Sequence, residues 1–210
     1  MVKFYVYISD DKLSMLGAQV RDGKLRRIGR KLDVNIDVLG IGASVKAGDP
    51  RPSDALRFDR LRLIERSIDV QEIGPISSGR PWIRESLRLR WGFVDSAQQA
   101  VCFTECTTSR VFVMGGSAKH LVGGMKVDQQ SHHAYSILPV LISTLLEHAH
   151  TSIPFSSPPD EPIEAAGILA ATIAGHAQNF EFLAKRLLST TDRQGRQVIL
   201  ASPLFVAMES

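Results

Sequence analysis

One segment of this chain constrains the fold more than any other, because apolar and charged side chains alternate strictly over residues 87–91, and Phe93 continues the apolar series. Leucine or aromatic residues at every second position enclose Arg88 and Arg90. This period of two is typical of a strand with one buried face. Two further strand patterns follow over residues 100–107 and 110–114, after short polar connections. Three strands so closely spaced predict an antiparallel meander in the middle of the chain.

The rest of the chain predicts a mixture of helices and strands around this meander. Strands are predicted over residues 4–8, 34–41 and 198–206, and helices over residues 10–21, 24–32, 57–68, 136–148 and 161–189. Asp22-Gly23 is expected to separate the first two helices, and Pro203 is expected to place part of the last strand at an edge or a bulge.

The resulting order is β-α-α-β-α-β-β-β-α-α-β, which predicts an α+β fold with one mostly antiparallel sheet packed against helices. Hydrophobic residues make up 44% and charged residues 22% of the 210 residues. This composition is that of an ordinary globular chain, and it excludes disordered and collagen-like classes. We therefore expect a single α+β domain over residues 1–210.

Cysteine content and hydropathy indicate the cellular compartment in which we expect the protein to act. The two cysteines, Cys102 and Cys106, are too few for a disulfide framework and are expected to be reduced thiols. The N-terminus lacks the apolar run of a signal peptide, and the best apolar segment, Ile137–Leu146, is too short to span a membrane. We expect a cytoplasmic protein that does not enter a membrane.

Charge is distributed unevenly along the chain. Residues 1–90 hold 18 Lys and Arg against 12 Asp and Glu, a net charge of +6, whereas residues 91–210 have a net charge of −3. This polarity predicts a basic face that would meet an anion, although solvated helix faces would produce the same pattern. Nucleic acid is not expected as a partner, because the basic residues lack interleaved aromatics and no nucleic-acid-binding motif is present.

The candidate ligand site combines two strand arginines with a glycine-rich segment. Glycine-rich loops let backbone N–H groups approach an anion, and a neighbouring lysine adds positive charge. A simpler interpretation is a flexible connection with turn glycines and solvated arginines. The segment lacks the pattern of a P-loop or of a dinucleotide-binding fingerprint. The candidate ligand-binding residues are Arg88, Arg90, Gly115, Gly116, Ser117, Lys119 and His120.

Three arrangements of residues in the sequence are candidates for catalysis or metal binding, and each has a simpler interpretation. Asp10 and Asp11 follow the first strand, where magnesium-dependent enzymes place carboxylates, but they would equally cap a helix. Cys106 and His120 would form a nucleophile pair only if the meander brought them together. Four further histidines, His132, His133, His148 and His150, match no zinc-binding spacing. No catalytic residue, cofactor or metal ligand is therefore assigned.

Several segments resemble an uncharacterised family of proteins from actinobacterial genomes, a domain of unknown function. The resemblance spans nearly the whole chain and implies a full-length member with one domain. It implies no reaction, cofactor or catalytic residue. The segments that carry it are Tyr5–Leu16, Arg57–Arg66, Leu87–Gly92, Gly115–Gly123 and Ser202–Ala207.

We hypothesise from the sequence a non-catalytic binding or regulatory domain for an anionic small molecule, possibly a nucleotide. One alternative is a protein-interaction or homo-oligomeric component that uses the alanine-rich face of the helix predicted over residues 161–189 and the apolar helix Ile137–Leu146. The other alternative is a metal-dependent phosphohydrolase built on Asp10 and Asp11.

Overall fold

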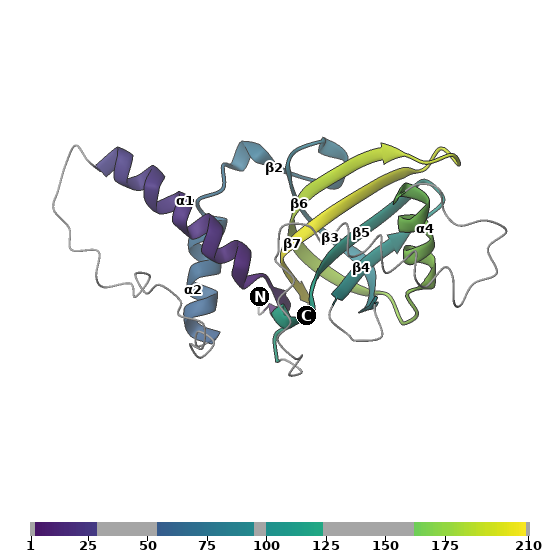
Figure 1. The fold of residues 1–210 in the computed structure, drawn as a ribbon, viewed down its shortest axis with the longest axis horizontal. Helices are drawn as coiled ribbons and strands as arrows, with labels where there is room; N and C mark the ends of the chain where they lie inside the picture. Colours follow the sequence, from purple (N-terminus) through teal and green to yellow (C-terminus); the bar gives the residue numbers. More distant parts are fainter. Residues whose placement is uncertain (1–2, 29–53, 95–99, 124–161, 209–210) are drawn as a thin grey trace. The chain divides into compact units, whose positions relative to one another are not determined.

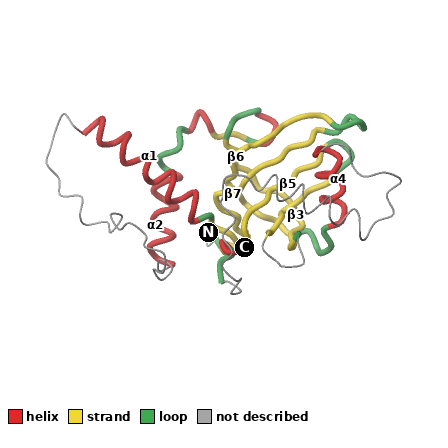
Figure 2. Tube along the Cα trace, viewed as in Figure 1, coloured by secondary structure: helices red, strands yellow, loops and turns green. Residues whose placement is uncertain are grey.

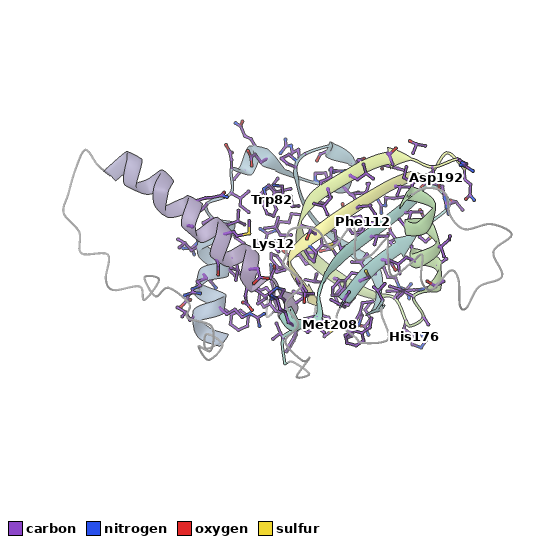
Figure 3. The ribbon with its side chains drawn as sticks, in the orientation of Figure 1. Lys12, Trp82, Phe112, His176, Asp192 and Met208 are labelled. Carbon is purple, nitrogen blue, oxygen red and sulfur yellow. The ribbon has the colours of Figure 1, made fainter. Side chains whose placement is uncertain are left out.

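A computed structural model of the chain describes residues 3–28, 54–94, 100–123 and 162–208. The chain forms two compact units, one of residues 1–9 and 69–210 and the other of residues 10–68. Strands occur in the first unit and the two longest helices in the second (Figure 2). The mixture of helix and strand predicted from the sequence is confirmed, whereas the single domain stays a prediction.

The smaller unit contains two helices that contact one another, α1 (Asp10–Ile28) and α2 (Asp54–Glu65). An ion pair joins them, in which Arg57 Nε donates to Asp10 Oδ1 at 2.7 Å. α1 continues through Asp22-Gly23, so the predicted break is wrong. A glycine in a helix interior costs only about 1 kcal/mol relative to alanine, which a helix of this length tolerates. The strand predicted over residues 34–41 lies outside the described residues.

The described residues of the larger unit form the strands, three 3₁₀ turns and one helix. The strands are β1 (Phe4–Ile8), β2 (Ile73–Gly74), β3 (Trp82–Phe93), β4 (Ala100–Cys106), β5 (Arg110–Ser117), β6 (Gln178–Thr191) and β7 (Gln197–Met208). The turns are η2 (Val70–Glu72), η3 (Ile76–Ser78) and η4 (Ala118–His120), and the helix is α4 (Pro162–Thr172).

Five of these strands close into a barrel (Figure 1). β3 pairs antiparallel with β4, and β4 pairs antiparallel with β5. β5 pairs in parallel with β7, and β6 closes the ring by pairing antiparallel with both β7 and β3. β1 adds to β7 and the short β2 adds to β3. The prediction of one mostly antiparallel sheet packed against helices did not include this closure or the parallel pairing of β5 with β7.

Side chains fill the interior of the barrel. Phe112 stacks on Phe182 with ring centroids 5.3 Å apart, and Phe103 meets Phe180 edge-on at 5.7 Å. All four rings are fully buried. A barrel of so few strands has an interior only wide enough for side chains. The inside of the barrel is thus a packed core in the part of the chain that the structure describes.

A second core lies between the outer surface of the barrel and α4. Ala166, Leu169, Ala170 and Ile173 recur at helical spacing and pack on outward side chains of β4, β5 and β7. The strands beneath α4 are therefore buried on both faces, which explains their nearly continuous apolar sequences.

The helix predicted over residues 161–189 is wrong beyond its first half. α4 ends at Thr172, and the chain turns at Gly175, whose φ of 129° is a conformation that favours glycine. β6 follows, with Phe180, Phe182 and Ala184 facing the interior. The spacing of the alanines before Gly175 favours a helix, whereas Gly175 and the alternation of Phe180 and Phe182 indicate the strand.

Pro203 lies at an irregularity of β7, as its sequence predicted. The register shifts between the pairs Leu183–Phe205 and Ala184–Pro203, which leaves Leu204 as the extra residue of a bulge. The proline is on a central strand rather than an edge, at the point where the neighbour of β7 changes from β5 to β1. None of the helices among the described residues has the length and hydropathy needed to cross a bilayer.

Gly116 should tolerate no side chain, because the ring of Tyr7 occupies the space. A Cβ built on Gly116 would lie closer to Tyr7 Oη and Cζ than any real contact, and Tyr7 is 1% exposed. We expect Gly116→Ala to lower the free energy of unfolding by about 1–3 kcal/mol, which urea denaturation would measure. Gly92→Ala, on β3 of the same barrel, is the matched control, since its Cβ would meet Ile173 at an ordinary 3.5 Å. Equal losses in both variants would contradict the packing argument.

Candidate functional site

Arg88 and Arg90 lie on the outer, solvent-facing side of β3. Both side chains are exposed, while the alternate residues Leu87 and Leu89 face the barrel interior. Arg88 is paired across the strands with Asn179 of β6, and Arg90 is paired with Thr104 of β4. The two arginines therefore lie on either side of the point where β3 changes its partner from β6 to β4.

The guanidinium of Arg88 is held in position by the chain that precedes β6. Arg88 Nε donates to the carbonyl oxygen of Ala177 at 3.3 Å. Neither Arg88 nor Arg90 forms an ion pair with any residue that the structure describes. Thr104, beside Arg90, is 1% exposed, and its Oγ1 has no hydrogen-bond partner among the described residues. This part of the face has positive charge and a polar group without a partner.

The same face has a second cluster whose charges are largely satisfied. Glu181 of β6 accepts from Lys3 Nζ at 2.6 Å and from Arg84 Nη2 at 2.9 Å. Burial by itself raises the pKa of the Glu181 carboxyl, but the hydrogen bonds and charges of Lys3 and Arg84 outweigh it and leave that pKa below its usual value. Lys3 also lies 5.7 Å from the ring centroid of Phe205. We call Lys3, Arg84 and Glu181 the paired cluster.

The glycine-rich segment is not the loop that its sequence predicted. Gly115, Gly116 and Ser117 complete β5 and pair with residues 100–102 of β4. Lys119 and His120 belong to η4, and His120 is buried with its ring edge-on to Tyr7 at a centroid distance of 5.8 Å. Gly116 has a packing role, because the ring of Tyr7 occupies the space that a side chain at this position would need.

The structure does not bring this segment together with the strand arginines on one open face. Gly115 pairs with Cys102, which pairs with Gly92 of β3, so two strand spacings, about 10 Å, separate β5 from β3. The outer surface between them lies under α4, because Cys102 and Val113 belong to the core that α4 covers. Of the predicted ligand residues, Arg88 and Arg90 alone share a solvent-facing strand surface.

The catalytic arrangements weighed from the sequence find no support among the described residues. Asp10 and Asp11 open α1, and Asp10 is paired with Arg57. No group of three His, Cys, Asp or Glu side chains that would hold a metal occurs in the described ranges. The histidines from His132 to His150 lie outside them.

Cys106 and His120 are also too far apart for a nucleophile pair. Cys106 is paired with Val111 at the start of β5, whereas His120 follows the end of β5, about 20 Å along the strand. Cys102 is buried and Cys106 is exposed, where Arg196 Nη1 lies 3.7 Å from its Sγ. The condition for a thiol–histidine pair is therefore not met, because β5 extends to Ser117, beyond the strand predicted over residues 110–114.

Sequence reasoning missed the β6 side of the face. Asn179, Glu181 and Lys185 were assigned to a helix, so their position beside the β3 arginines was not foreseen. The alternation of Phe180 and Phe182 was the available signal, because it places the residues between and beside them on the opposite, outer face.

Comparison with known proteins places the chain in a family but assigns no activity. Residues 3–210 match the family of unknown function DUF7019, so the chain belongs to that family. No curated protein and no solved structure matches the chain significantly.

Lys12 is expected to make stability depend on pH. Burial lowers the pKa of its ammonium from 10.5 to about 8, while the charge of Asp11 acts in the opposite direction. Between these two values the unfolded chain binds more protons than the folded one, so the free energy of unfolding should rise as pH increases. Below pH 8 both states are charged, and the folded state is destabilised by the buried charge.

The variant Lys12→Met keeps an apolar stem and removes this charge. It should be more stable than the parent at pH 7, and the rise in stability between pH 8 and 10 should shrink, as measured by urea denaturation across that range. Lys185→Met, at an exposed lysine of β6, is the matched control and should keep the parent's pH profile. A parent profile retained in Lys12→Met would rule out Lys12 as the group responsible.

Proposed function

We propose that this DUF7019 member is a non-catalytic binding or regulatory protein for an anionic small molecule, which the outer face of β3 and β6 holds through Arg88 and Arg90. The observation that carries the proposal is the absence of any ion pair for these two exposed arginines within the described residues, four and six positions from Arg84, an arginine on the same face that is paired with Glu181.

Arginine is well suited to this task. Its planar guanidinium presents several donors and binds phosphate or carboxylate with two parallel hydrogen bonds. The bond from Arg88 Nε to Ala177 leaves the Nη donors for a ligand and reduces the conformational freedom that binding would remove. Asn179, exposed across from Arg88, adds an amide donor to the same surface.

Barrels with this strand order commonly bind ligands on a face that is covered in this protein. Its strand order, with a helix before the fourth barrel strand, resembles that of OB-fold barrels, which bind oligonucleotides on the face of their second and third strands. The corresponding strands here are β4 and β5, and α4 covers their outer face. Fold alone does not assign function, and here it favours the open β3–β6 face instead.

Within the described residues, some of the groups that motivated the alternative hypotheses have another structural role. Ala166 and Ala170, two of the alanines proposed for a partner, are buried against the barrel of the same chain. The apolar segment Ile137–Leu146 lies outside the described residues. Asp10, proposed for magnesium, is paired with Arg57. Free thiols at Cys102 and Cys106 are consistent with action in the cytoplasm, which we propose as its location.

Removing one of the two arginines should weaken anion binding. We expect Arg88→Gln or Arg90→Gln to lower the affinity for inorganic phosphate about tenfold, the effect of losing an arginine–phosphate contact of about 1.4 kcal/mol. Nuclear magnetic resonance titration with phosphate in about 0.1 M salt would measure the affinity and identify the backbone amides that respond.

Lys185→Gln is the control, because it removes one positive charge from an exposed position on the same pair of strands. Lys185 pairs with Trp82, about 20 Å along β3 from Arg88, which is roughly twice the distance over which charges act in 0.1 M salt. Its phosphate affinity should match the parent. A loss in Lys185→Gln equal to that in Arg88→Gln would show general charge attraction and refute the site.

A further inference from the structure

We infer that the ligand of this site is a compact phosphate monoester rather than a linear polyanion. The inference rests on the proposed function and specifies its ligand class. Three features of the β3–β6 face carry it: the reach of the arginines, the position of Glu181, and the match of charge.

The spacing along β3 allows two arginines, and no more, to meet on one phosphate. Arg88 and Arg90 are two residues apart on the same face, which separates their Cα atoms by about 7 Å, within the span of two arginine side chains. Arg84 is about 14 Å from Arg88 along the strand. Its guanidinium is also held by Glu181 through both Nε and Nη2, at 3.3 and 2.9 Å.

Glu181 interrupts the row of positive charge that a polyanion would need. It is paired across the strands with Ser86, midway between Arg84 and Arg88. Its carboxylate binds Lys3 and Arg84, and their hydrogen bonds and charges keep its pKa low, so it stays ionised. A polyanion that ran along β3 would meet this carboxylate and would have to displace it from both cations. The paired cluster therefore marks the limit of the site.

The charge of the two arginines matches that of a phosphate monoester. Arg88 and Arg90 together supply two positive charges without an ion pair among the described residues, and a phosphate monoester carries about −1.5 to −2 at pH 7. A phosphodiester within a nucleic-acid backbone carries one negative charge and is less well matched. A ligand with a terminal phosphate thus fits the two arginines best.

Three thymidine ligands separate the possibilities when titrated into the intact protein and followed by isothermal calorimetry. They are thymidine monophosphate, an oligothymidylate of about twelve nucleotides with a 5′-hydroxyl, and the same oligomer with a 5′-phosphate. We expect the monophosphate and the 5′-phosphorylated oligomer to bind within about threefold of each other, and the 5′-hydroxyl oligomer to bind at least about tenfold more weakly.

The other outcomes are distinguishable from one another. Tighter binding of the 5′-hydroxyl oligomer than of the monophosphate would overturn the compact-ligand inference and leave anion binding intact. No binding of any of the three ligands, together with no response to inorganic phosphate, would overturn the proposed function itself. Arg88→Gln should abolish the preference for the 5′-phosphate, whereas Lys185→Gln should retain it.

A variant of the paired cluster tests the role given to Glu181. Glu181→Gln keeps the shape of the side chain but releases the charges of Lys3 and Arg84. The affinity for the 5′-hydroxyl oligomer should then rise at least about fivefold. Its dependence on salt should steepen by about 1.4 in the slope of log K against log salt, which corresponds to two further phosphates. An unchanged affinity and slope at an unchanged melting temperature would show that Glu181 does not limit the ligand.

Discussion

The closure of the barrel depends on β7, which is paired along nearly the whole length of both of its edges. It lies parallel to β5 and then antiparallel to β1 on one side, and antiparallel to β6 on the other. Nearly all of its residues are buried on both faces. Buried backbone N–H and C=O groups must be hydrogen-bonded, so a strand this apolar is stable only at the centre of a sheet. Pro203, which lacks an N–H, lies where β7 exchanges one neighbour for another.

Closure decides where polar chemistry is possible in this unit. The interior is filled by phenylalanine rings, and α4 covers the outer face of β4, β5 and β7. The outer face of β3 and β6 keeps its exposed charged residues and is the face that the arginines share. On that face Glu181 neutralises the end at Arg84 and leaves the end at Arg88 and Arg90 positive, and the proposed site is confined to these two arginines.

The sequence identified half of this site. Strict alternation placed Arg88 and Arg90 on one face of a strand, because the side-chain period of a strand does not depend on its partners. The β6 residues beside these arginines were not predicted to lie there, because the alanines before Gly175 suggested a helix that continued into β6. The glycine-rich segment was misassigned for a different reason. Gly116 permits the close approach of Tyr7, a residue more than a hundred positions away, and no local pattern shows such a contact.

The sequence by itself determined the local elements: a strand at Phe4–Ile8, the strands around the β3 arginines, a helix over much of residues 57–68, and a bulge near Pro203. These depend on periodicity and on the backbone limits of proline, which act over a few residues. The tertiary structure alone decided that the strands close, that α4 covers one side of the barrel, and that Glu181 pairs with Arg84 rather than leaving it for a ligand. Those outcomes depend on contacts between residues far apart in the chain, whose free energies no local pattern records.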